Sequence, residues 1–352
     1  FPYTTLFRSQ AADAVEAARA RIAAAMRVDP RSLVFTSGAT EANNLAIKGV
    51  LRALGPDRHV IATAAEHRSV LDPVRRIQRS GGPVTILPVD SFGCVDPDAV
   101  RKALTPRTAL VSAIWANNEV GSLNAIEEIG QACRENGVLF HTDATQALGR
   151  IDIDLSRLPI DLLSASAHKL YGPKGVGILY VRRGSPRIRI EPLLDGGGHE
   201  QHLRSGTLPV PLIVGFGRAC ELAAEQRPTE QLRIAALRDR LWQGLSAGIG
   251  GLVLNGQSTQ RLAGNLNVSV PGVDGEALMT SLTQIAVSSG SACTTAEPEP
   301  SHVLRAMGRS DLLTRSSLRF GIGRYNTVEE IDAAIAHVID VVARIRGADG
   351  RR

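Results

Sequence analysis

One lysine of this 352-residue chain stands where covalent chemistry is expected. Lys169 lies within residues 164–175 (SASAHKLYGPKG), after an apolar run, with small hydroxyl residues before it and a Gly-Pro turn after it. Desolvation and cationic neighbours keep such an amine neutral, so that it can form an imine with a carbonyl cofactor. The alternative is an ordinary surface lysine, because most lysines lie at the surface.

Polar residues at the ends of other predicted strands extend this candidate site. Asp143 follows an apolar run, and a carboxylate there can keep the pyridine nitrogen of pyridoxal phosphate (PLP) protonated, which makes the ring an electron sink. Residues 37–41 (SGATE) open a helix after a strand and leave N–H groups free for a phosphate, although an ordinary helix cap looks the same. His67 follows a further strand, and alone it favours a structural role. Together these residues form one constellation.

The cysteines are few and lie far apart: Cys94, Cys133, Cys220 and Cys293. They form no CxxC pair and follow no secretory signal, which favours free thiols in a reducing cytosol over a disulfide or zinc framework. The first three fall within or beside regular elements, and we expect them to be small buried hydrophobes. Cys293 falls in a run of small polar residues followed by Glu-Pro-Glu-Pro, which predicts a mobile loop, and without other information an exposed loop cysteine suffices.

Composition narrows the class of protein. The chain is 43% hydrophobic and 21% charged, which is typical of a soluble packed protein, and its length predicts one large or two unequal domains. The net charge is +5, but basic and acidic residues alternate along the chain, so no nucleic-acid-binding stripe is predicted. The absence of any run of 18 apolar residues argues against a membrane span.

Strands and helices that must position the candidate residues alternate along the first two thirds of the chain. Strands are predicted at residues 33–36, 60–63, 84–87, 109–114, 138–141, 162–165 and 176–180, and helices at 40–54, 70–80, 97–104 and 126–136. This rhythm predicts an α/β fold with a mostly parallel sheet covered on both faces. A long helix at 211–249 and short strands at 252–254, 265–270, 285–288 and 318–322 predict a smaller α+β domain.

Residues 1–9 (FPYTTLFRS) resemble the in-frame translation of a sequencing-adapter oligonucleotide. They carry neither an initiator Met nor a targeting pattern, and we exclude them from the fold prediction. The Ala-rich helix that starts at Gln10 joins a domain already under way, so we expect the first segment of the large domain to be missing. We therefore predict a large domain at residues 10–208 and a small domain at 209–352 that carries the Cys293 loop.

From Gln10 to about Ile345 the chain resembles the group I cysteine desulfurases, PLP enzymes of the class V aminotransferase family. The strings that carry the resemblance, in family order, are TSGATEANNLAIKG, EH, NNEVG, DATQ, SAHKLYGPKG, GGGHEQ, RSGTLPV, SSGSACT and LRFGIGR. Several long strings in order are specific, whereas any one tripeptide would be weak. The resemblance implies the PLP-dependent transferase fold type I, with a mostly parallel mixed sheet and a smaller C-terminal α+β domain.

The resemblance also implies a role for each matched residue at the cofactor. Lys169 is the Schiff-base lysine, Asp143 pairs with the pyridine nitrogen, and Gln146 hydrogen-bonds the ring hydroxyl. His67 stacks on the ring and serves in proton transfer, as the acceptor of the proton from the incoming thiol. The residues implied at the phosphate are Ala39, Thr40, Ser166 and His168, together with Thr207, which reaches the phosphate of the partner subunit.

The implied reaction converts L-cysteine to L-alanine. Asn118 and Arg319 grip the substrate carboxylate, and Cys293 attacks the substrate sulfur and keeps it as a persulfide. An acceptor such as an iron–sulfur scaffold protein then takes the sulfur, for iron–sulfur cluster assembly or other thio-cofactors. The resemblance further implies a cytoplasmic homodimer with a shared active site, with no metal, nucleic acid or membrane involved.

Two alternatives stay open. Another class V PLP enzyme, an aminotransferase or a selenocysteine lyase, would share Lys169 and Asp143 but would not need Cys293. A non-catalytic scaffold in a sulfur-transfer complex would lack the visible absorbance of a lysine-bound cofactor.

Overall fold

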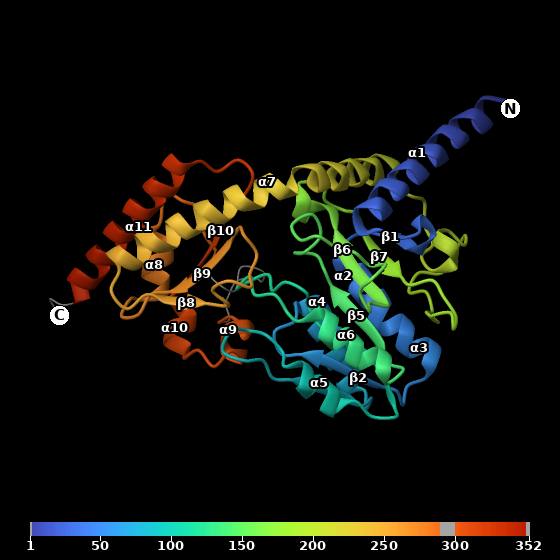
Figure 1. Ribbon diagram of the computed structural model, residues 1–352, viewed down its shortest axis with the longest axis horizontal. Coiled ribbons are helices and arrows are strands. Elements are labelled where there is room, and N and C mark those ends of the chain that lie inside the picture. Colours follow the sequence, from blue (N-terminus) through green and yellow to red (C-terminus); the bar gives the residue numbers. More distant parts are fainter. Residues whose placement is uncertain (1, 289–299, 350–352) are drawn as a thin grey trace. The chain divides into compact units, whose positions relative to one another are not determined.

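The computed structural model describes residues 2–288 and 300–349 (Figure 1), so the predicted nucleophile Cys293 lies outside the described residues. The chain divides into two compact units. The first comprises Phe1–Leu87, Val95–Ala116 and Asn124–Arg227, and the second comprises Pro88–Cys94, Asn117–Leu123 and Pro228–Arg352. The break at Pro228 lies inside helix α7 (Val210–Gly248), beyond the boundary at residues 208 and 209 that we predicted. The two short segments that join the second unit were not predicted.

A seven-stranded sheet forms the centre of the first unit, in the order β1-β7-β6-β5-β4-β2-β3. Its strands are β1 (Leu33–Thr36), β2 (His59–Thr63), β3 (Val84–Leu87), β4 (Thr108–Ser112), β5 (Leu139–Asp143), β6 (Leu162–Ser166) and β7 (Gly177–Val181). Strands β3, β2, β4, β5 and β6 are parallel to one another, and β7 is antiparallel to both β6 and β1. Every residue of β2, β4 and β6 is buried, as expected for parallel strands covered on both faces. All seven predicted strands are confirmed, with ends that shift by two residues at most.

Helices flank this sheet at the positions that the sequence predicts. They are α1 (Pro2–Met26), α2 (Ala39–Asn44), α3 (Val50–Leu54), α4 (Arg68–Arg79), α5 (Pro97–Ala103), α6 (Ile126–Glu135) and the first part of α7. The predicted helix at 40–54 consists of α2, a π-helical stretch (Leu45–Gly49) and α3. Ala42 of α2, Leu45 of the π-helical stretch and Val50 of α3 are buried in one cluster with Val34 of β1 and Leu179 of β7, which packs this helical segment against the sheet. Helix α1 begins at Pro2 rather than at Gln10.

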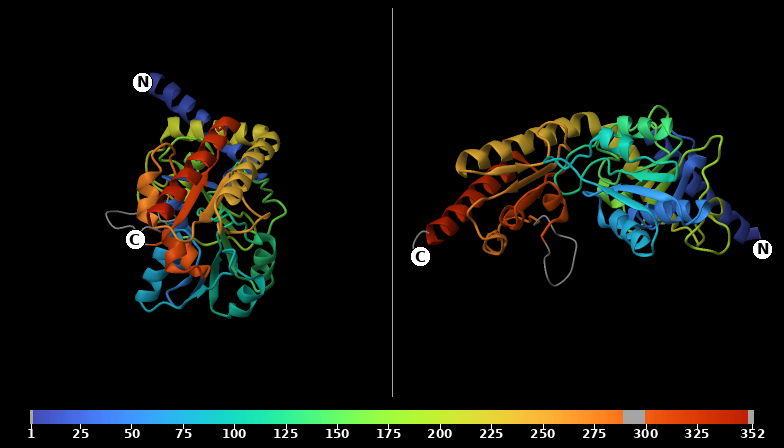
Figure 2. Two further views of the ribbon diagram at one scale, coloured as in Figure 1. Left: turned by 90° about the vertical axis from the view of Figure 1, so that its left-hand side faces the viewer. Right: turned by 90° about the horizontal axis from the view of Figure 1, so that it is seen from below.

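The second unit contains a three-stranded antiparallel sheet in the order β10-β9-β8. Its elements are β8 (Val253–Asn255), β9 (Asn265–Ser269), α8 (Gly275–Ser281), α9 (His302–Ala306), α10 (Asp311–Arg315), β10 (Ser317–Gly321) and α11 (Val328–Asp349). Figures 1 and 2 show α11 alongside the second half of α7, where a Cβ on Gly248 would lie 2.2 Å from Cδ1 of Ile339. The strand predicted at 285–288 is wrong: the segment forms a single bridge, from Ser288 to Arg319, so no ladder develops.

A close contact between two glycines joins β7 to the turn that begins α2. Gly38 precedes α2 with φ 152° and ψ 177°, a conformation that is nearly confined to glycine. A Cβ on Gly177 would lie 2.6 Å from the Gly38 Cα and 2.6 Å from the carbonyl oxygen of Ala165. Both neighbours are backbone atoms, so a side chain cannot be accommodated by rotation of another side chain.

We expect Gly177→Ala to lower the free energy of unfolding by about 1–3 kcal/mol, because the methyl group overpacks this contact. Gly321→Ala is the matched control, because Gly321 also lies in a strand and a Cβ there would meet nothing within 4 Å. Urea unfolding of the two variants and the parent measures the difference. Equal stability of the two variants would contradict the proposed contact.

Candidate active site

Three predicted site residues follow the carboxyl ends of parallel strands. His67 follows β2, Asp143 ends β5, and Lys169 lies in a 3-10 helix (Ala167–Leu170) that follows β6. Strands β5 and β6 are neighbours in the sheet, and β4 separates β5 from β2. Because parallel strands direct their carboxyl ends to one edge of a sheet, the topology brings the three residues to that edge, which is where open α/β sheets bind ligands.

Asp143 is buried, with 3% of its surface exposed, and donors from two segments hold its carboxylate. Asn43 Nδ2 donates to Oδ2 at 2.8 Å, and the backbone N–H of Thr145 donates to Oδ1 at 2.9 Å. A carboxylate can accept about four hydrogen bonds, so capacity is left for a protonated pyridine nitrogen. The buried Oγ1 of Thr145 also has no hydrogen-bond partner in the described part of the chain. These observations fit a PLP ring at Asp143.

His67 is the N-cap residue of α4, and its orientation is set by Ser69. The backbone N–H of Ser69 donates to His67 Nδ1 at 3.1 Å, and Ser69 Oγ lies 2.7 Å from the same nitrogen. Ser69 Oγ in turn accepts a hydrogen bond from Asn43 Nδ2 at 2.8 Å. Sequence reasoning missed both Asn43 and Ser69. The available signal in the sequence was that Asn43 is a polar residue between apolar residues, Ala42 and Leu45, which the structure shows to be buried.

Two more titratable groups are buried near Asp143, and burial keeps both in their neutral forms near pH 7. Burial raises the pKa of Glu66 to about 8, and the charge of Asp143 adds to the shift. Hydrogen bonds to Glu66 Oε1 from Thr63 Oγ1 (2.6 Å) and from the backbone N–H of Ile114 (2.8 Å) oppose it. Burial likewise lowers the pKa of His141.

Lys169 is half-buried, and its carbonyl oxygen accepts a hydrogen bond from Arg150 Nη2 at 2.9 Å. Arg150 Nη1 also donates to Oε1 of Gln146, so the predicted partner of the ring hydroxyl is held by an arginine in this structure. Next to Lys169, Nδ1 of His168 lies 2.8 Å from Ser166 Oγ. Partial burial, followed by the positive charges of Lys169 and Lys174, lowers the pKa of His168.

The turn predicted to bind phosphate is tied to a distant segment by Glu41. Its Oε2 accepts from the backbone N–H of Ser37 at 2.7 Å, and its Oε1 accepts from Arg204 Nε at 2.9 Å. Burial raises the pKa of Glu41, but these hydrogen bonds outweigh it and the pKa is lowered. The ion pair brings the segment of the exposed Thr207 to the turn that holds Ala39 and the exposed Thr40.

The two residues predicted to bind the substrate carboxylate contact each other in the second unit. Arg319, on β10, donates from Nη1 to the backbone oxygen of Asn118 at 3.1 Å. The turn around Asn118 is shaped by Asn117, whose Oδ1 accepts from the N–H groups of Glu119 and Val120. The buried Oδ1 of Asn118 has no hydrogen-bond partner within the residues that the structure describes. The pair therefore presents a guanidinium beside an amide oxygen that can still accept a hydrogen bond.

The three described cysteines have the properties of protonated, packed thiols. Cys133 and Cys220 are buried and Cys94 is half-buried, and all three are free. Burial raises the pKa of Cys94 to about 11 and that of Cys133 to about 12, and it also raises the pKa of Cys220. Since the thiolate is the nucleophile, none of these three is suited to attack a substrate near neutral pH.

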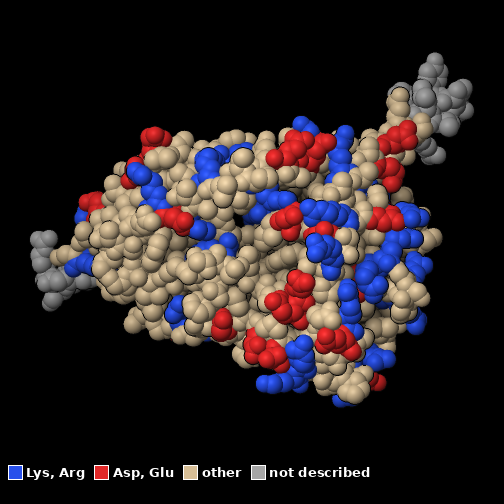
Figure 3. Space-filling model, viewed as in Figure 1, with Lys and Arg blue, Asp and Glu red and all other residues tan. Residues whose placement is uncertain are grey.

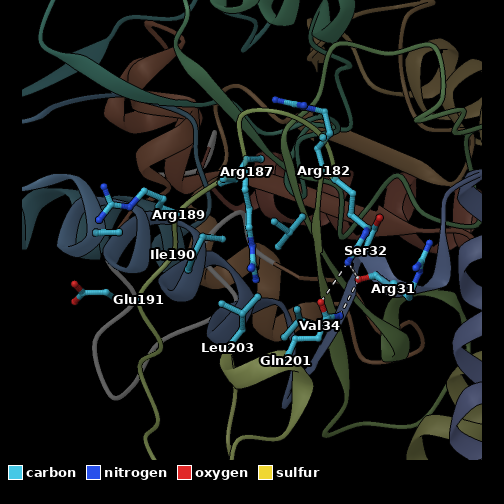
Figure 4. Close-up of a pocket in the computed structure, with 15 residues that line it drawn as sticks. Arg31, Ser32, Val34, Arg182, Arg187, Arg189, Ile190, Glu191, Gln201 and Leu203 are labelled. Atoms are coloured by element: carbon cyan, nitrogen blue, oxygen red, sulfur yellow. Dashed lines mark hydrogen bonds between the residues drawn. The ribbon is translucent and has the colours of Figure 1, made fainter.

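A cavity of about 650 Å³ in the first unit lies apart from these residues. Five arginines line it: Arg31, Arg182, Arg183, Arg187 and Arg189. Figure 4 shows Arg187 extending through the middle of the cavity, with Arg31 and Arg182 on one side and Arg189 on the other. Arg31 pairs with Asp29 at 2.6 Å and Arg182 with Asp161 at 2.7 Å. None of the predicted site residues lines this cavity, so it is not the candidate active site.

Other classes of site find little support in the described parts of the chain. Within residues 2–288 and 300–349, no three His, Cys, Asp or Glu side chains are grouped so as to hold a metal ion. None of the helices described is long and apolar enough to cross a membrane. On the face shown in Figure 3, Lys and Arg side chains are interspersed with Asp and Glu.

Comparison with known proteins identifies the family. The chain matches the class-V aminotransferase family over residues 4–334. It is 52% identical over 341 residues to a protein named cysteine desulfurase IscS from Histophilus somni, which covers 97% of this chain and 84% of that protein. A solved structure named NifS-like protein superposes with a TM-score of 0.87 at 35% identity, covering 95% of this chain and 88% of that one. Another, described as SspA in complex with cysteine, gives a TM-score of 0.78 at 36% identity, with 91% and 89% covered.

The chain belongs to the class-V aminotransferase family, whose members are PLP-dependent enzymes. Its relatives at about 50% identity within that family are named cysteine desulfurases. The predicted family, fold class and cofactor are confirmed.

The buried carboxyl of Glu66 predicts a pH dependence of stability. Its pKa is raised in the folded state, so the folded chain holds a proton that the unfolded chain releases above about pH 4.5, and stability falls as the pH rises toward 8. We expect Glu66→Gln, which keeps the Oε1 acceptor and cannot ionise, to remove this decline and to be more stable than the parent at pH 8. Urea unfolding at pH 5, 6.5 and 8 measures the effect.

The exposed Glu128→Gln on α6 is the control and should keep the parental slope. An identical slope in Glu66→Gln and the parent would show that Glu66 is not held protonated.

Proposed function

We propose that this chain is a cysteine desulfurase that converts L-cysteine to L-alanine and keeps the sulfur as a persulfide on Cys293. The observation that carries the proposal is the placement of Asp143 and Lys169 after neighbouring strands, with the Asp143 carboxylate buried and held by two donors. The names of the relatives supply the reaction class, and the structural neighbour SspA, solved in complex with cysteine, supplies a substrate.

The residues that we propose to hold PLP all lie in the first unit. Lys169 would bind the cofactor covalently, Asp143 would accept from the pyridine nitrogen, and Gln146 would serve the ring hydroxyl. Ala39, Thr40, Ser166 and His168 hold the phosphate, and Thr207 serves the phosphate of a partner subunit. When bound, PLP supplies an electron sink for negative charge at the substrate Cα.

His67 lies against the ring in this proposal. Its contacts with Ser69 occupy Nδ1, so Nε2 is the ring nitrogen that is open to the reaction. The amine of Lys169 would be the base that moves the proton of the substrate Cα. Asn118 and Arg319 bind the substrate carboxylate, for which a planar guanidinium is suited.

The sulfur-transfer step uses Cys293. Its thiolate attacks the substrate sulfur, a sulfur–sulfur bond forms, and the bond between that sulfur and the substrate Cβ breaks with its electron pair staying on the carbon side. A proton added at that carbon and the return of a proton to Cα complete L-alanine, and one sulfur atom stays on Cys293. The raised pKa values of Cys94 and Cys133 support this choice of thiol.

We further propose a homodimer that shares its active sites and acts in the cytoplasm. The exposed position of Thr207, beside the turn fixed by Glu41, supports a contribution to a neighbouring subunit. The sulfur acceptor is a protein with a nucleophilic thiol, such as an iron–sulfur scaffold protein, because only a nucleophile can take the outer sulfur of a persulfide.

Replacing the proposed nucleophile separates a desulfurase from other enzymes of the family. We expect Cys293→Ala to keep the visible absorbance of bound PLP but to release no sulfide above background from L-cysteine in the presence of dithiothreitol. Cys94→Ala is the control and should keep the parental rate, since its thiol is protonated near neutral pH. Lys169→Ala should lose the visible absorbance, which a non-catalytic scaffold would never have shown.

Full sulfide release by Cys293→Ala would refute the assignment of the nucleophile. Release of selenide from selenocysteine without sulfide from cysteine would favour the lyase alternative.

The proposed carboxylate grip predicts a specific kinetic effect. We expect Arg319→Lys to raise the KM for L-cysteine by roughly 10-fold or more with a smaller change in kcat, because lysine cannot form the bidentate pair. Arg324→Lys is the matched control, because Arg324 pairs with Glu230 at 2.5 Å and is not assigned to the site. Steady-state kinetics of alanine formation measures both. An unchanged KM in Arg319→Lys would contradict this role.

A further inference from the structure

We propose that Asn43 and Ser69 are positioning residues that connect the carboxylate of Asp143 to the ring of His67 and hold that ring as the neutral tautomer with its proton on Nε2. The inference rests on the proposed function, because His67 is there assigned to the face of the cofactor ring and Asp143 to its nitrogen. It adds two residues to which the sequence motifs assign no role.

The connection is a continuous row of short hydrogen bonds among buried groups. Asn43 is 0% exposed, and its Nδ2 lies 2.8 Å from Asp143 Oδ2 and 2.8 Å from Ser69 Oγ. Ser69 is 8% exposed, and its Oγ lies 2.7 Å from His67 Nδ1. The row therefore spans from the end of β5, through α2, to the start of α4.

The direction of each hydrogen bond follows from Asp143. An ionised carboxylate can only accept, so the amide of Asn43 must turn its NH₂ group toward Asp143, and a flipped amide would place an oxygen against the carboxylate. The same NH₂ group then donates to Ser69 Oγ. Because His67 Nδ1 already accepts from the backbone N–H of Ser69, the Ser69 hydroxyl is the donor in its own contact with that nitrogen. Asn43 thus donates to both Asp143 and Ser69, and Ser69 donates to His67.

A second contact fixes the state of His67 independently. The backbone N–H of Ser69 donates to His67 Nδ1 at 3.1 Å, and a backbone N–H has no alternative role as an acceptor. Nδ1 therefore receives two donors and carries no proton itself. A neutral imidazole must then carry its single proton on Nε2.

This assignment changes the chemistry expected of His67. With the proton on Nε2, the open nitrogen of the ring is a hydrogen-bond donor, whereas the sequence predicted an acceptor for the proton of the incoming thiol. To accept that proton, the ring would have to take a proton at Nδ1 and give up both hydrogen bonds from Ser69. The geometry thus favours His67 as a hydrogen-bond donor toward the bound ligands.

A helix cap alone does not require this arrangement. The backbone contact from Ser69 is sufficient to cap α4, as the side chain of an N-cap residue normally does. The Ser69 hydroxyl and the Asn43 amide add nothing to that cap, but they couple the cap to a carboxylate that lies 100 residues away from Asn43 in the sequence. The buried row of hydrogen bonds from Asp143 to His67 favours one arrangement of these side chains, and Asn43 Oδ1 is the atom in it that has no hydrogen-bond partner within the described residues.

The test is the tautomer of His67 in the PLP-loaded, full-length protein. Long-range proton–nitrogen NMR correlation on protein with ¹⁵N-labelled histidine distinguishes a protonated from an unprotonated ring nitrogen, and His67→Gln assigns the signals. We expect Nε2 to be protonated and Nδ1 unprotonated at pH 8. In Ser69→Ala, the Nδ1 signal should move away from its hydrogen-bonded position, and Ser69→Thr, which keeps the hydroxyl, should restore it.

Asn43 is tested by affinity for the cofactor. We expect Asn43→Leu to weaken PLP binding by roughly 10- to 100-fold, measured by fluorescence quenching, because the carboxylate loses a charge-assisted hydrogen bond. Asn44→Leu is the matched control: Asn44 lies next to it on α2, and its side chain donates only to the carbonyl oxygen of Thr40 in its own helix. Asn44→Leu should bind PLP as the parent does.

A proton on His67 Nδ1 in the parent, or an Nδ1 signal that does not respond to Ser69→Ala, would overturn the proposal. Equal PLP affinity of Asn43→Leu and Asn44→Leu would overturn the part assigned to Asn43. Each result is independent of sulfide release. An inactive protein with the expected tautomer would therefore refute the proposed function and leave the network standing, whereas an active protein with the other tautomer would do the opposite.

Discussion

A carboxylate buried at the end of a strand must be surrounded by donors, and much of the first unit is arranged to meet this requirement around Asp143. Burial of an unpartnered charge is costly, so the side chain depends on Asn43 and on the backbone of Thr145. Asn43 belongs to α2, whose Ala42 is buried in the hydrophobic cluster that includes Val34 of β1 and Leu179 of β7. The turn before α2, where the phosphate is proposed to bind, is therefore positioned by the same helix that stabilises the carboxylate.

Two buried titratable groups near Asp143 add no charge to this edge of the sheet near pH 7. Glu66 and His141 could both carry charge in water, but burial raises the pKa of the first and lowers that of the second. His141 has hydroxyl partners on both ring nitrogens, Ser112 Oγ at 2.8 Å and Ser164 Oγ at 2.9 Å, which suit a neutral imidazole. With Glu66 and His141 neutral, the carboxylate of Asp143 is the charged group that would pair with the pyridine nitrogen of PLP.

In the second unit, a short segment that follows a strand of the first unit is held in place by hydrogen bonds from a sheet. Asn117–Leu123 belongs to this unit although it follows β4 of the first. The side chains of Asn265 and Asn267 on β9 donate to the carbonyl oxygen of Glu119, and Arg319 on β10 donates to that of Asn118. Residues that are 146 to 201 positions apart in sequence thus meet, because the adjacent strands β9 and β10 donate to consecutive carbonyl groups of one turn.

By itself, the sequence determined the class of fold, the seven strands of the main sheet and the positions of Lys169 and Asp143, because apolar runs and turn residues are local signals. Only the tertiary structure decided the break at Pro228, the loss of the strand at 285–288 and the parts of Asn43 and Ser69. The physical reason is the separation along the chain of the residues that each signal involves. A strand is specified by its own hydrophobicity, whereas a hydrogen bond between Asn43 and Asp143 exists only once two distant segments are packed side by side.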